Sequence, residues 1–375
     1  MKINLRALFG VSALAFLLVA TPVFAAEVDV TGENVQTGAD SDNDNDFDVD
    51  SDVDKDVDND GDVDNEADAD VDTGHNEQNQ NTTGGDLESG AVDASTDWES
   101  VVNAGAAVLG ADDASLDVTA DFTNDTTGAD SDNSNDLDVD HDVDLDLDNL
   151  ADIFNELDLD ATTGHNEQNK NTEAGDTTTG DVSVDAMIGN WANNDSGFAS
   201  AAGASTTVDV TAENNTTGAD SDNDNDIDVD NDLDVDIDND ADIDNKIDVD
   251  ADTGHNEQNQ NTTGGDLTTG DVDVTTEIEN SANNGSSASG AGSSELDVTA
   301  DFTNDTTGAD SDNSNDLDVD QNVDVNIEND ADISNELDVD ANTGHNDQNK
   351  NTTAGDLTSG DVDVNFTSTT EVNSN

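Results

Sequence analysis

The chain has 375 residues and a formal net charge of -89, with 95 acidic residues against six lysines and arginines. So acidic a chain argues against nucleic acids and anionic membranes as partners, because both are recognised by basic surfaces. The partners that such a surface favours are cations. There is no cysteine, which excludes a disulfide framework and a lipid-anchored lipoprotein.

Residues 1–25 read as a secretory signal peptide. Lys2 and Arg6 form a basic start, an apolar run follows, and small residues lead to a predicted cleavage site after Ala25. An uncleaved membrane anchor is the alternative interpretation. No second apolar segment follows, so we expect a secreted mature chain, at the cell surface or in an extracellular matrix, that does not insert into the membrane.

The rest of the chain consists of four repeats with a period of 90 residues. The string TGADSDN begins at Thr37, Thr127, Thr217 and Thr307, and the string TGHN begins at Thr73, Thr163, Thr253 and Thr343. We place the repeats at 26–116, 117–206, 207–296 and 297–375. Because an active site rarely occurs in four copies, the repetition favours a structural or multivalent binding role.

Each repeat contains a stretch in which acidic residues alternate with other residues. From 220 to 252 the even positions are Asp at sixteen of seventeen, with Lys246 as the exception, and from 40 to 72 all seventeen are acidic. The odd positions are mostly apolar, with spaced asparagines. This period of two predicts a β-strand with one carboxylate face and one inward face, since a helix would mix the two classes.

A single strand of this length would span roughly 110 Å, whereas typical strands have about five or six residues. We therefore expect short strands joined at corners and stacked coil upon coil. The predicted fold is all-β, an elongated, parallel β-helix-like β-solenoid. The inward polar residues predicted to lie at corners and to stack as ladders are Asn225, Asn231, Asn239 and Asn245, with Asn45, Ser51, Asn59 and Asn65 as their equivalents. High charge and low hydrophobicity also permit disorder when no cation is bound.

One short motif carries a resemblance to a known family. It reads Asn59-x-Gly61-x-Val63-x-Asn65, Asn149-x-Ala151-x-Ile153-x-Asn155, Asn239-x-Ala241-x-Ile243-x-Asn245 and Asn329-x-Ala331-x-Ile333-x-Asn335. It resembles the N-x-A-x-V-x-Q core of curlin repeats, with Asn in place of Gln. More broadly, the chain resembles secreted bacterial repeat proteins of β-solenoid type that are rich in Asn, Asp, Thr and Gly. The curlin resemblance implies an extracellular amyloid-like fibre subunit that associates with itself.

The carboxylate face is the candidate metal site, and calcium, bound as several ions, is the expected cation. Calcium takes six to eight hard oxygen ligands and tolerates irregular geometry, which adjacent rows of Asp can supply. The candidate ligands are Asp228, Asp230, Asp232, Asp234, Asp236, Asp238, Asp240 and Asp242, together with Asp48, Asp50, Asp52, Asp54, Asp56 and Asp58. Residues 56–67 begin like an EF-hand loop but end on Ala67, so no calcium motif is present. Halophilic surface solvation, calcium storage and mineral nucleation remain alternatives.

Two further features complete the sequence pattern. His75, His165, His255 and His345 each precede an acidic residue by two positions, which predicts a polar ladder or turn, with a metal site as the alternative. The variable segments that hold Trp98 and Trp191 are predicted to be loops or irregular coil. There is no nucleophile elbow, phosphate-binding loop or HExxH motif, so we predict a protein that is not an enzyme.

Overall fold

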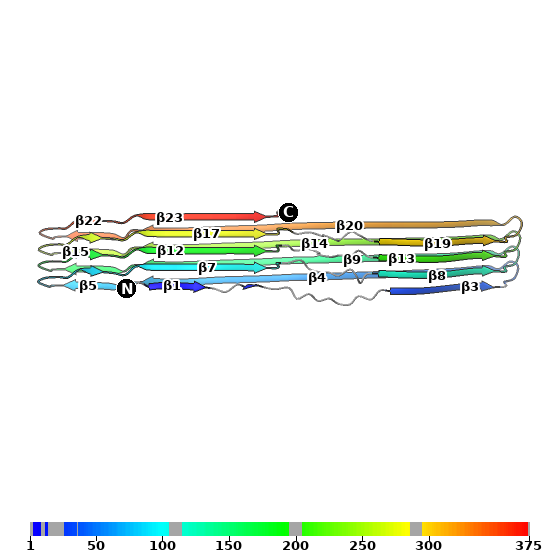
Figure 1. Cartoon of the computed structure of the whole chain (residues 1–375), viewed down its shortest axis with the longest axis horizontal. Coiled ribbons are helices and arrows are strands. Elements are labelled where there is room, and N and C mark those ends of the chain that lie inside the picture. The colour runs from blue at the N-terminus through cyan, green and yellow to red at the C-terminus, as the bar shows by residue number, and fades with distance from the viewer. Residues whose placement is uncertain are drawn as a thin grey trace.

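The computed structural model describes residues 3–8, 12–13, 26–35, 37–104, 115–194, 205–285 and 295–373. All regular structure within these ranges is β, and every strand pair is parallel. The long acidic strands pair residue i with residue i+90, so that Asp132 lies beside Asp222 and Asp222 beside Asp312. Each repeat therefore forms one coil, and four coils stack as a β-solenoid (Figure 1). The predicted fold class is confirmed.

One layer of the solenoid contains the acidic stretches as single strands of 31 residues, each followed by a strand of five residues. The long strands are β4 (Asp42–Asp72), β9 (Asp132–Thr162), β14 (Asp222–Asp252) and β20 (Asp312–Asn342). The short strands are β5 (His75–Asn79), β10 (His165–Asn169), β15 (His255–Asn259) and β21 (His345–Asn349). Both sets pair in coil order, from the first coil to the fourth.

The opposite layer returns the chain to its starting end in three shorter sets of strands. After the turn come β6 (Leu87–Glu88), β11 (Thr177–Thr178), β16 (Leu267–Thr268) and β22 (Leu357–Thr358). Then come β7 (Val92–Val102), β12 (Val182–Ala192), β17 (Val272–Ala282) and β23 (Val362–Val372). The strands that lead into each long strand are β3 (Ala26–Val35), β8 (Ser115–Asp125), β13 (Ser205–Asn215) and β19 (Glu295–Asp305). The N-terminal strands β1 (Ile3–Leu8) and β2 (Ser12–Ala13) pair with β7.

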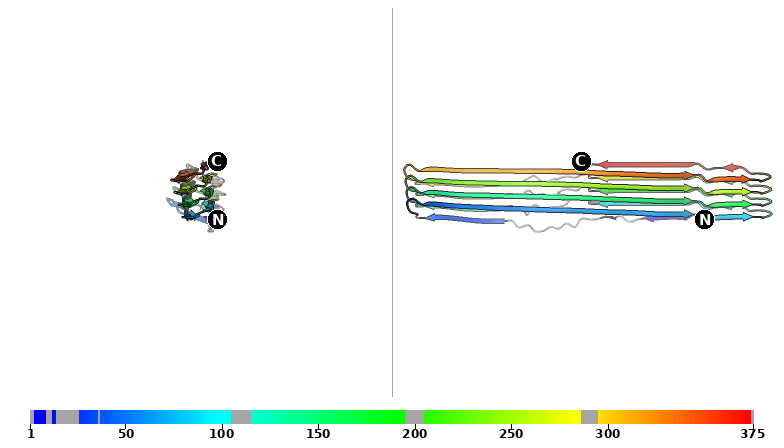
Figure 2. Two further views of the ribbon diagram at one scale, coloured as in Figure 1. Left: turned by 90° about the vertical axis from the view of Figure 1, so that its left-hand side faces the viewer. Right: turned by 180° about the vertical axis from the view of Figure 1, so that it is seen from behind.

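The molecule is longest along its strands and short along the stacking axis (Figure 1, Figure 2). A strand of 31 residues spans about 100 Å at 3.3 Å per residue. The prediction of short strands joined at corners is therefore wrong, although each coil does stack on the next. Asn225, Asn231, Asn239 and Asn245 all lie within one uninterrupted strand, not at bends.

The chain reverses direction in TGADSDN at one end and after the strands of five residues at the other, where Gln260 has φ of 60°, whereas TGHN joins each long strand to its strand of five residues (Figure 1). In TGADSDN the backbone of Asp130 has φ of 55°, and the Ser131 hydroxyl donates to the Gly128 carbonyl at 2.7 Å. In TGHN the φ of Gly254 is 80°, and its N–H donates to the Asp252 carboxylate at 2.6 Å. A side chain on Gly254 would also collide with the Gly164 carbonyl of the coil below, which makes glycine necessary in this stack.

The space between the layers is filled by the inward positions of both. At one end, Ile227 and Val229 of β14 pack with Val118 and Phe122 of β8, all four fully buried. At the other end, the long strands pack against β7, β12 and β17 in two further apolar clusters. Buried and exposed residues alternate along the whole of β14 except at Asp232 and Asp252, which are half-buried. The predicted inward and outward faces are thus confirmed.

Buried asparagines interrupt the apolar core and form ladders along the stacking axis, as predicted for Asn225, Asn239 and Asn245. The row of Ser51 and Asn231 is mixed, because it also contains His141 and Gln321. The Asn59 amide donates to Asn149 at 2.6 Å, Asn149 to Asn239 at 2.7 Å, and Asn239 to Asn329 at 2.7 Å. Within this ladder each amide bonds to its equivalent 90 residues away, so the correct register is also the one that pairs these amides. Asn225 and Asn245 continue similar ladders.

The structure corrects one more prediction and leaves another outside its range. Trp98 lies in β7, where it is 2% exposed, and Trp191 lies in β12, so these parts of the variable segments are strands and not loops. The predicted cleavage site after Ala25 lies outside the described residues. Within the described ranges, no helix is long and apolar enough to cross a membrane.

Candidate cation-binding face

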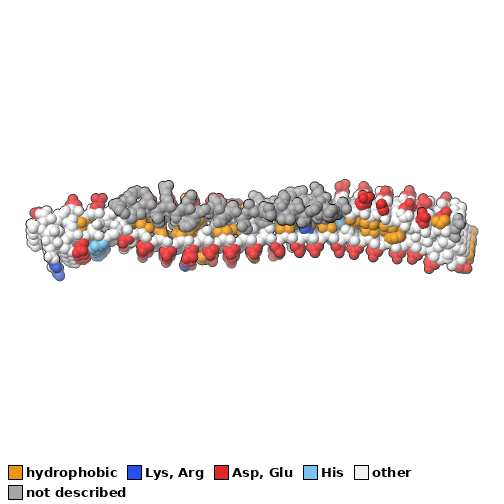
Figure 3. Space-filling view, turned by 90° about the horizontal axis from the view of Figure 1, so that it is seen from below, with side chains coloured by type: hydrophobic (Ala, Val, Ile, Leu, Met, Phe, Trp, Pro, Cys, Tyr) orange, Lys and Arg blue, Asp and Glu red, His pale blue; other side chains and the backbone are white. Residues whose placement is uncertain are grey.

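The outward positions of β4, β9, β14 and β20 form one surface, here called the carboxylate face. It contains every predicted ligand: Asp48, Asp50, Asp52, Asp54, Asp56 and Asp58 on β4, and Asp228, Asp230, Asp232, Asp234, Asp236, Asp238, Asp240 and Asp242 on β14. All are exposed except Asp232, which is half-buried. Figure 3 shows acidic side chains projecting at regular intervals along the length of the molecule.

The stacking of the coils turns these positions into rows that cross the long strands. Nine rows are acidic in all four coils, and their members on β14 are Asp222, Asp226, Asp228, Asp230, Asp234, Asp238, Asp242, Asp248 and Asp250. Neighbouring coils are 4.7 Å apart where the stacked rings of His75 and His165 measure the spacing. Each carboxylate therefore has like charges at about 4.8 Å across the coils and about 6.6 Å along its own strand.

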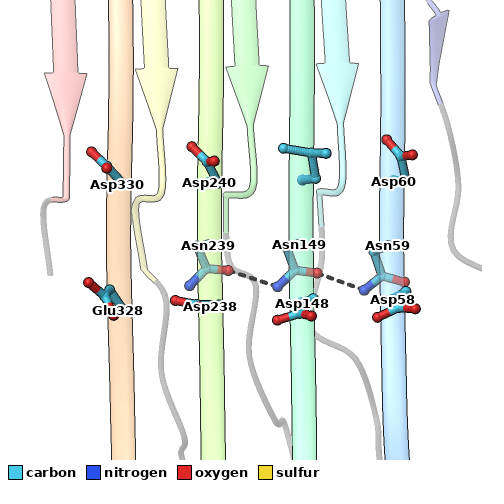
Figure 4. A pocket seen from close by; sticks show the side chains of 11 residues that line it. Asp58, Asn59, Asp60, Asp148, Asn149, Asp238, Asn239, Asp240, Glu328 and Asp330 are labelled. Carbon is cyan, nitrogen blue, oxygen red and sulfur yellow. Dashed lines mark hydrogen bonds between the residues drawn. The ribbon is translucent and has the colours of Figure 1, made fainter.

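One of these nine rows and the row next to it border a hollow near the middle of the face (Figure 4). The hollow has a volume of about 620 Å³. One bordering row contains Asp58, Asp148, Asp238 and Glu328, and the other contains Asp60, Asp240 and Asp330 with Leu150 in place of an acid. Between the rows lies the strand segment whose inward side chains form the Asn59 ladder. Seven carboxylates around one hollow offer the hard oxygen ligands that calcium requires.

The electrostatics of the face disfavour full ionisation. Burial raises the pKa of Asp148 above its ordinary value of 3.8, and the charges of Asp238 and Asp58 on the adjacent coils raise it further. The same two causes raise the pKa of Asp228, with Asp138 and Asp318 as the nearest charges. Bound cations would remove this mutual repulsion, since an opposite charge favours the ionised carboxylate.

Some positions of the carboxylate face are occupied by residues that are not acidic. Lys246 is a cation within an otherwise acidic row and forms an ion pair with Glu156 of the coil below. Leu150 is 44% exposed in a row of aspartates. In β20, Asn322 and Asn326 replace the acids found at the equivalent positions of β14. The fourth coil therefore carries fewer carboxylates than the coils below it.

A second group of ionisable side chains lies beyond the carboxylate face, on the outward positions of β5, β10, β15 and β21. The rings of His75, His165, His255 and His345 stack at centroid distances of 4.7, 4.7 and 4.8 Å, which confirms the predicted polar ladder. Burial lowers the pKa of His255 below 6.5, and the neighbouring His165 and His345 lower it further. Figure 3 shows histidine beside acidic side chains at this end of the molecule.

The sequence predicts a polar ladder or turn at these histidines and a metal site only as the alternative, whereas the geometry favours both. Ligand atoms of His75, His165 and Glu167 lie within 4.8 Å of one another, as do those of His165, His255 and Glu257. The signal was the His-x-Glu spacing, which places both side chains on the same strand face, combined with its recurrence at the repeat period. Pairing across coils, which brings two histidines together, requires the knowledge that one repeat is one coil.

Comparison with known proteins identified no relatives: no family model matches the chain, and no curated protein or solved structure matches it.

Proposed function

We propose that this chain is a secreted structural repeat protein of the cell surface or extracellular matrix, without enzymatic activity, whose carboxylate face binds divalent cations, calcium above all. The observation that supports this most is the set of nine rows in which every coil places an acidic residue at the same outward position. The predicted signal peptide supports secretion. Storage of calcium or nucleation of a mineral would use the same face.

The energetics of the rows favour a role for bound ions. Two unit charges 4.8 Å apart repel by roughly 0.9 kcal/mol in bulk water before screening. Nine rows with three contacts between coils raise this to more than about 20 kcal/mol, whereas a typical domain has a net stability of about 5–15 kcal/mol. Cations that bridge adjacent carboxylates offset the repulsion, and an ion that binds only the folded array stabilises it.

Direct measurement of bound calcium tests the proposal. Equilibrium dialysis should find many ions per chain, and fewer in a variant that carries Asp228→Asn, Asp230→Asn, Asp234→Asn and Asp238→Asn. A matched control removes four exposed charges from the other layer, through Asp209→Asn, Asp273→Asn, Asp297→Asn and Asp301→Asn. The control should retain its bound calcium. Equal losses in both variants would show that total charge, as in a halophilic surface, accounts for the binding.

A second candidate function, a fibre subunit, is favoured by the open edge of the fourth coil. Inward residues that are buried in the middle coils are exposed here: Leu317 is 41%, Val364 45% and Phe366 48% exposed. An exposed strand edge of this length is a template for pairing with another chain. The first coil of a second copy would continue the stack, with Asn59 of that copy extending the ladder that ends at Asn329.

Lys55 opposes such growth at the first coil. It is half-buried at an inward position of β4, where the other coils have Leu145, Val235 and Val325. An inward charge on an edge strand is a known means of preventing edge pairing. Lys55→Val should therefore promote end-to-end assembly in calcium, seen by sedimentation velocity and electron microscopy. If the variant and the natural chain both stay monomeric in calcium, the fibre role is wrong.

A further inference from the structure

The strands β5, β10, β15 and β21 bring together a donor set that the carboxylate face lacks. Their sequence is HNEQN in the first three coils and HNDQN in the fourth. Parallel pairing in register places the four histidines in one row and the four acids in the next row on the same face. The alternate residues point inward, where Asn166 and Gln168 are fully buried.

Imidazole nitrogens and a carboxylate oxygen meet between adjacent coils. The rings of His165 and His255 are parallel within 1° at 4.7 Å, and the His255 Nε2 lies 3.8 Å from Glu257 Oε2. In a tetrahedral zinc site the ligand atoms lie about 3.4 Å apart, given Zn–N bonds of about 2.0–2.1 Å. The side chains of His255 and Glu257 are 33% and 27% exposed, so small side-chain rotations on an open surface are enough to bring the donors onto one ion.

The carboxylates of this row are already held in place. The Asn259 Nδ2 donates to Glu257 Oε1, and the Asn169 Nδ2 donates to Glu167 Oε1. The amide oxygen of Asn169 in turn accepts from the backbone N–H of Asn259 at 3.0 Å. Hydrogen bonds of this kind orient the ligands of metal sites and raise affinity. They leave the second oxygen, Oε2, available on the side where Glu257 faces the histidine.

We propose that the histidine and glutamate rows of the first three coils bind a divalent transition metal of the Zn²⁺ class. Two neutral imidazoles and one carboxylate form the ligand set, and water completes the coordination. Nitrogen donors favour such metals, whereas calcium and magnesium prefer oxygen, so this site is distinct from the carboxylate face. The two three-residue groups share His165, and we therefore expect one tightly bound ion per chain.

The fourth coil supplies a matched control. His345 stacks on His255 at 4.8 Å, but its neighbour is the shorter Asp347, and neither residue belongs to a three-ligand group. His165→Asn removes a ligand from both groups, whereas His345→Asn removes a ring from the same ladder and from neither group. A second variant with Glu167→Gln and Glu257→Gln retains all four histidines and removes the carboxylate from both groups.

The experiment uses the untagged chain in excess calcium, which occupies the carboxylate face, with Co²⁺ as a spectroscopic probe and Zn²⁺ as its competitor. The natural chain and His345→Asn should each show the absorption of one nitrogen-ligated, tetrahedral Co²⁺ that Zn²⁺ displaces. His165→Asn should lose this spectrum, and the double glutamine variant should bind at least about tenfold more weakly, because a direct ligand matters no less than the groups that orient it. Circular dichroism checks that each variant remains folded.

Two results would overturn the proposal. One is a natural chain whose bound Co²⁺ shows only the octahedral, oxygen-ligated spectrum, since the ion would then lie on the carboxylate face. The other is equal Zn²⁺ affinity in the natural chain and the double glutamine variant, which decides the question even if His165→Asn does not fold.

Discussion

At Ile227 and Asp228 two adjacent residues occupy opposite environments. Ile227 is fully buried among Val118, Phe122 and Val229, whereas Asp228 is exposed within a row of four carboxylates. The alternation that continues from these two residues defines the inside and the outside of the coil. Substitutions at such neighbouring positions should therefore have opposite effects on stability.

Ile227→Asp places a carboxylate in the apolar core and should lower the free energy of unfolding by more than about 3 kcal/mol. Asp228→Asn removes one like charge from between Asp138 and Asp318 and should raise stability when no cation is present. Urea denaturation measures both, in enough sodium chloride to fold the natural chain without divalent ions. Similar effects of the two substitutions would contradict the assignment of the two faces.

Acid should stabilise the cation-free chain. Burial and neighbouring aspartates raise the pKa of Asp132, Asp136, Asp140, Asp144 and Asp148 on β9, and of Asp226, Asp228 and Asp242 on β14. A raised folded-state pKa contributes stability that is complete below the ordinary value of 3.8 and is lost as the pH rises through the raised value.

In enough sodium chloride to fold the chain without divalent ions, the thermal unfolding midpoint should therefore rise as the pH falls from 7 toward about 4. His255 acts in the opposite direction, because its lowered pKa gives stability above 6.5 that is lost as the pH falls through the folded value. Because His255 is a single group, the contribution of the aspartates determines the overall pH dependence of stability. With saturating calcium the dependence should reverse, because protons then compete with the ion. A midpoint that falls steadily with acid in the cation-free chain would contradict the proposed repulsion.

At the scale of the strand, the asparagine ladders fix the register. Asn149 is 3% exposed, accepts from Asn59 at 2.6 Å and donates to Asn239 at 2.7 Å. The ladders also join the two layers, since Asn124 donates to Asn135 at 3.0 Å and Asn155 to Asn190 at 3.0 Å. A long, flat strand pairing is thus specified at several points along its length.

Asn149→Ala should destabilise the chain by about 1–3 kcal/mol, because it removes the acceptor of the Asn59 amide N–H and a donor to the amide oxygen of the buried Asn239. The matched control is Asp148→Asn, the outward neighbour on the same strand, which should not lower stability. Chemical denaturation compares the two in sodium chloride without divalent ions, so that the loss of a calcium ligand at Asp148 does not affect the comparison. If Asn149→Ala costs no more than Asp148→Asn, the ladder does not stabilise the stack.

The period of two and the 90-residue repeat predicted the fold class and the two faces, but not the length of the strands. The prediction of short strands rests on the typical length of strands in proteins. The absence of strand-breaking residues points the other way, because β9, β14 and β20 contain no glycine or proline and β4 contains only Gly61. Turn residues with positive φ, such as Asp130 and Gly254, lie only beyond the strand ends. The sequence also predicts a loop around Trp191, where the structure has strand β12. The signal for this strand is the inward alternation of Val182, Val184, Ala186 and Ile188.

At the scale of the whole molecule, each coil is an interchangeable layer. Contacts between strands are made with the coil directly above or below, through pairing at the repeat period. Solenoids of this kind gain stability from nearest-neighbour contacts between repeats. The predicted repeat boundary between 116 and 117 falls within β8, at the same phase as 296 and 297 in β19.

Deletion of residues 117–296 joins Leu116 to Asp297, the equivalent of Asp117, and removes two whole coils without a change of phase. The shorter chain should fold in calcium with a lower unfolding midpoint, measured by circular dichroism. A control deletion of residues 117–260 does not remove a whole number of repeats. It therefore breaks the register, and the resulting chain should not fold. If both deletions behave alike, the coils are not modular.

The central claim, that cations hold the stacked carboxylate rows together, is tested most directly by folding the chelated chain at low ionic strength and adding ions while the circular dichroism is recorded. Millimolar calcium should convert a disordered or weakly β spectrum into a strong β spectrum. Magnesium should be less effective because it retains its water, and sodium at equal ionic strength less effective still because it screens without coordinating. A chain that shows the full β spectrum in chelator at low salt would contradict the claim. So would a chain that folds only in molar sodium chloride and does not respond to calcium.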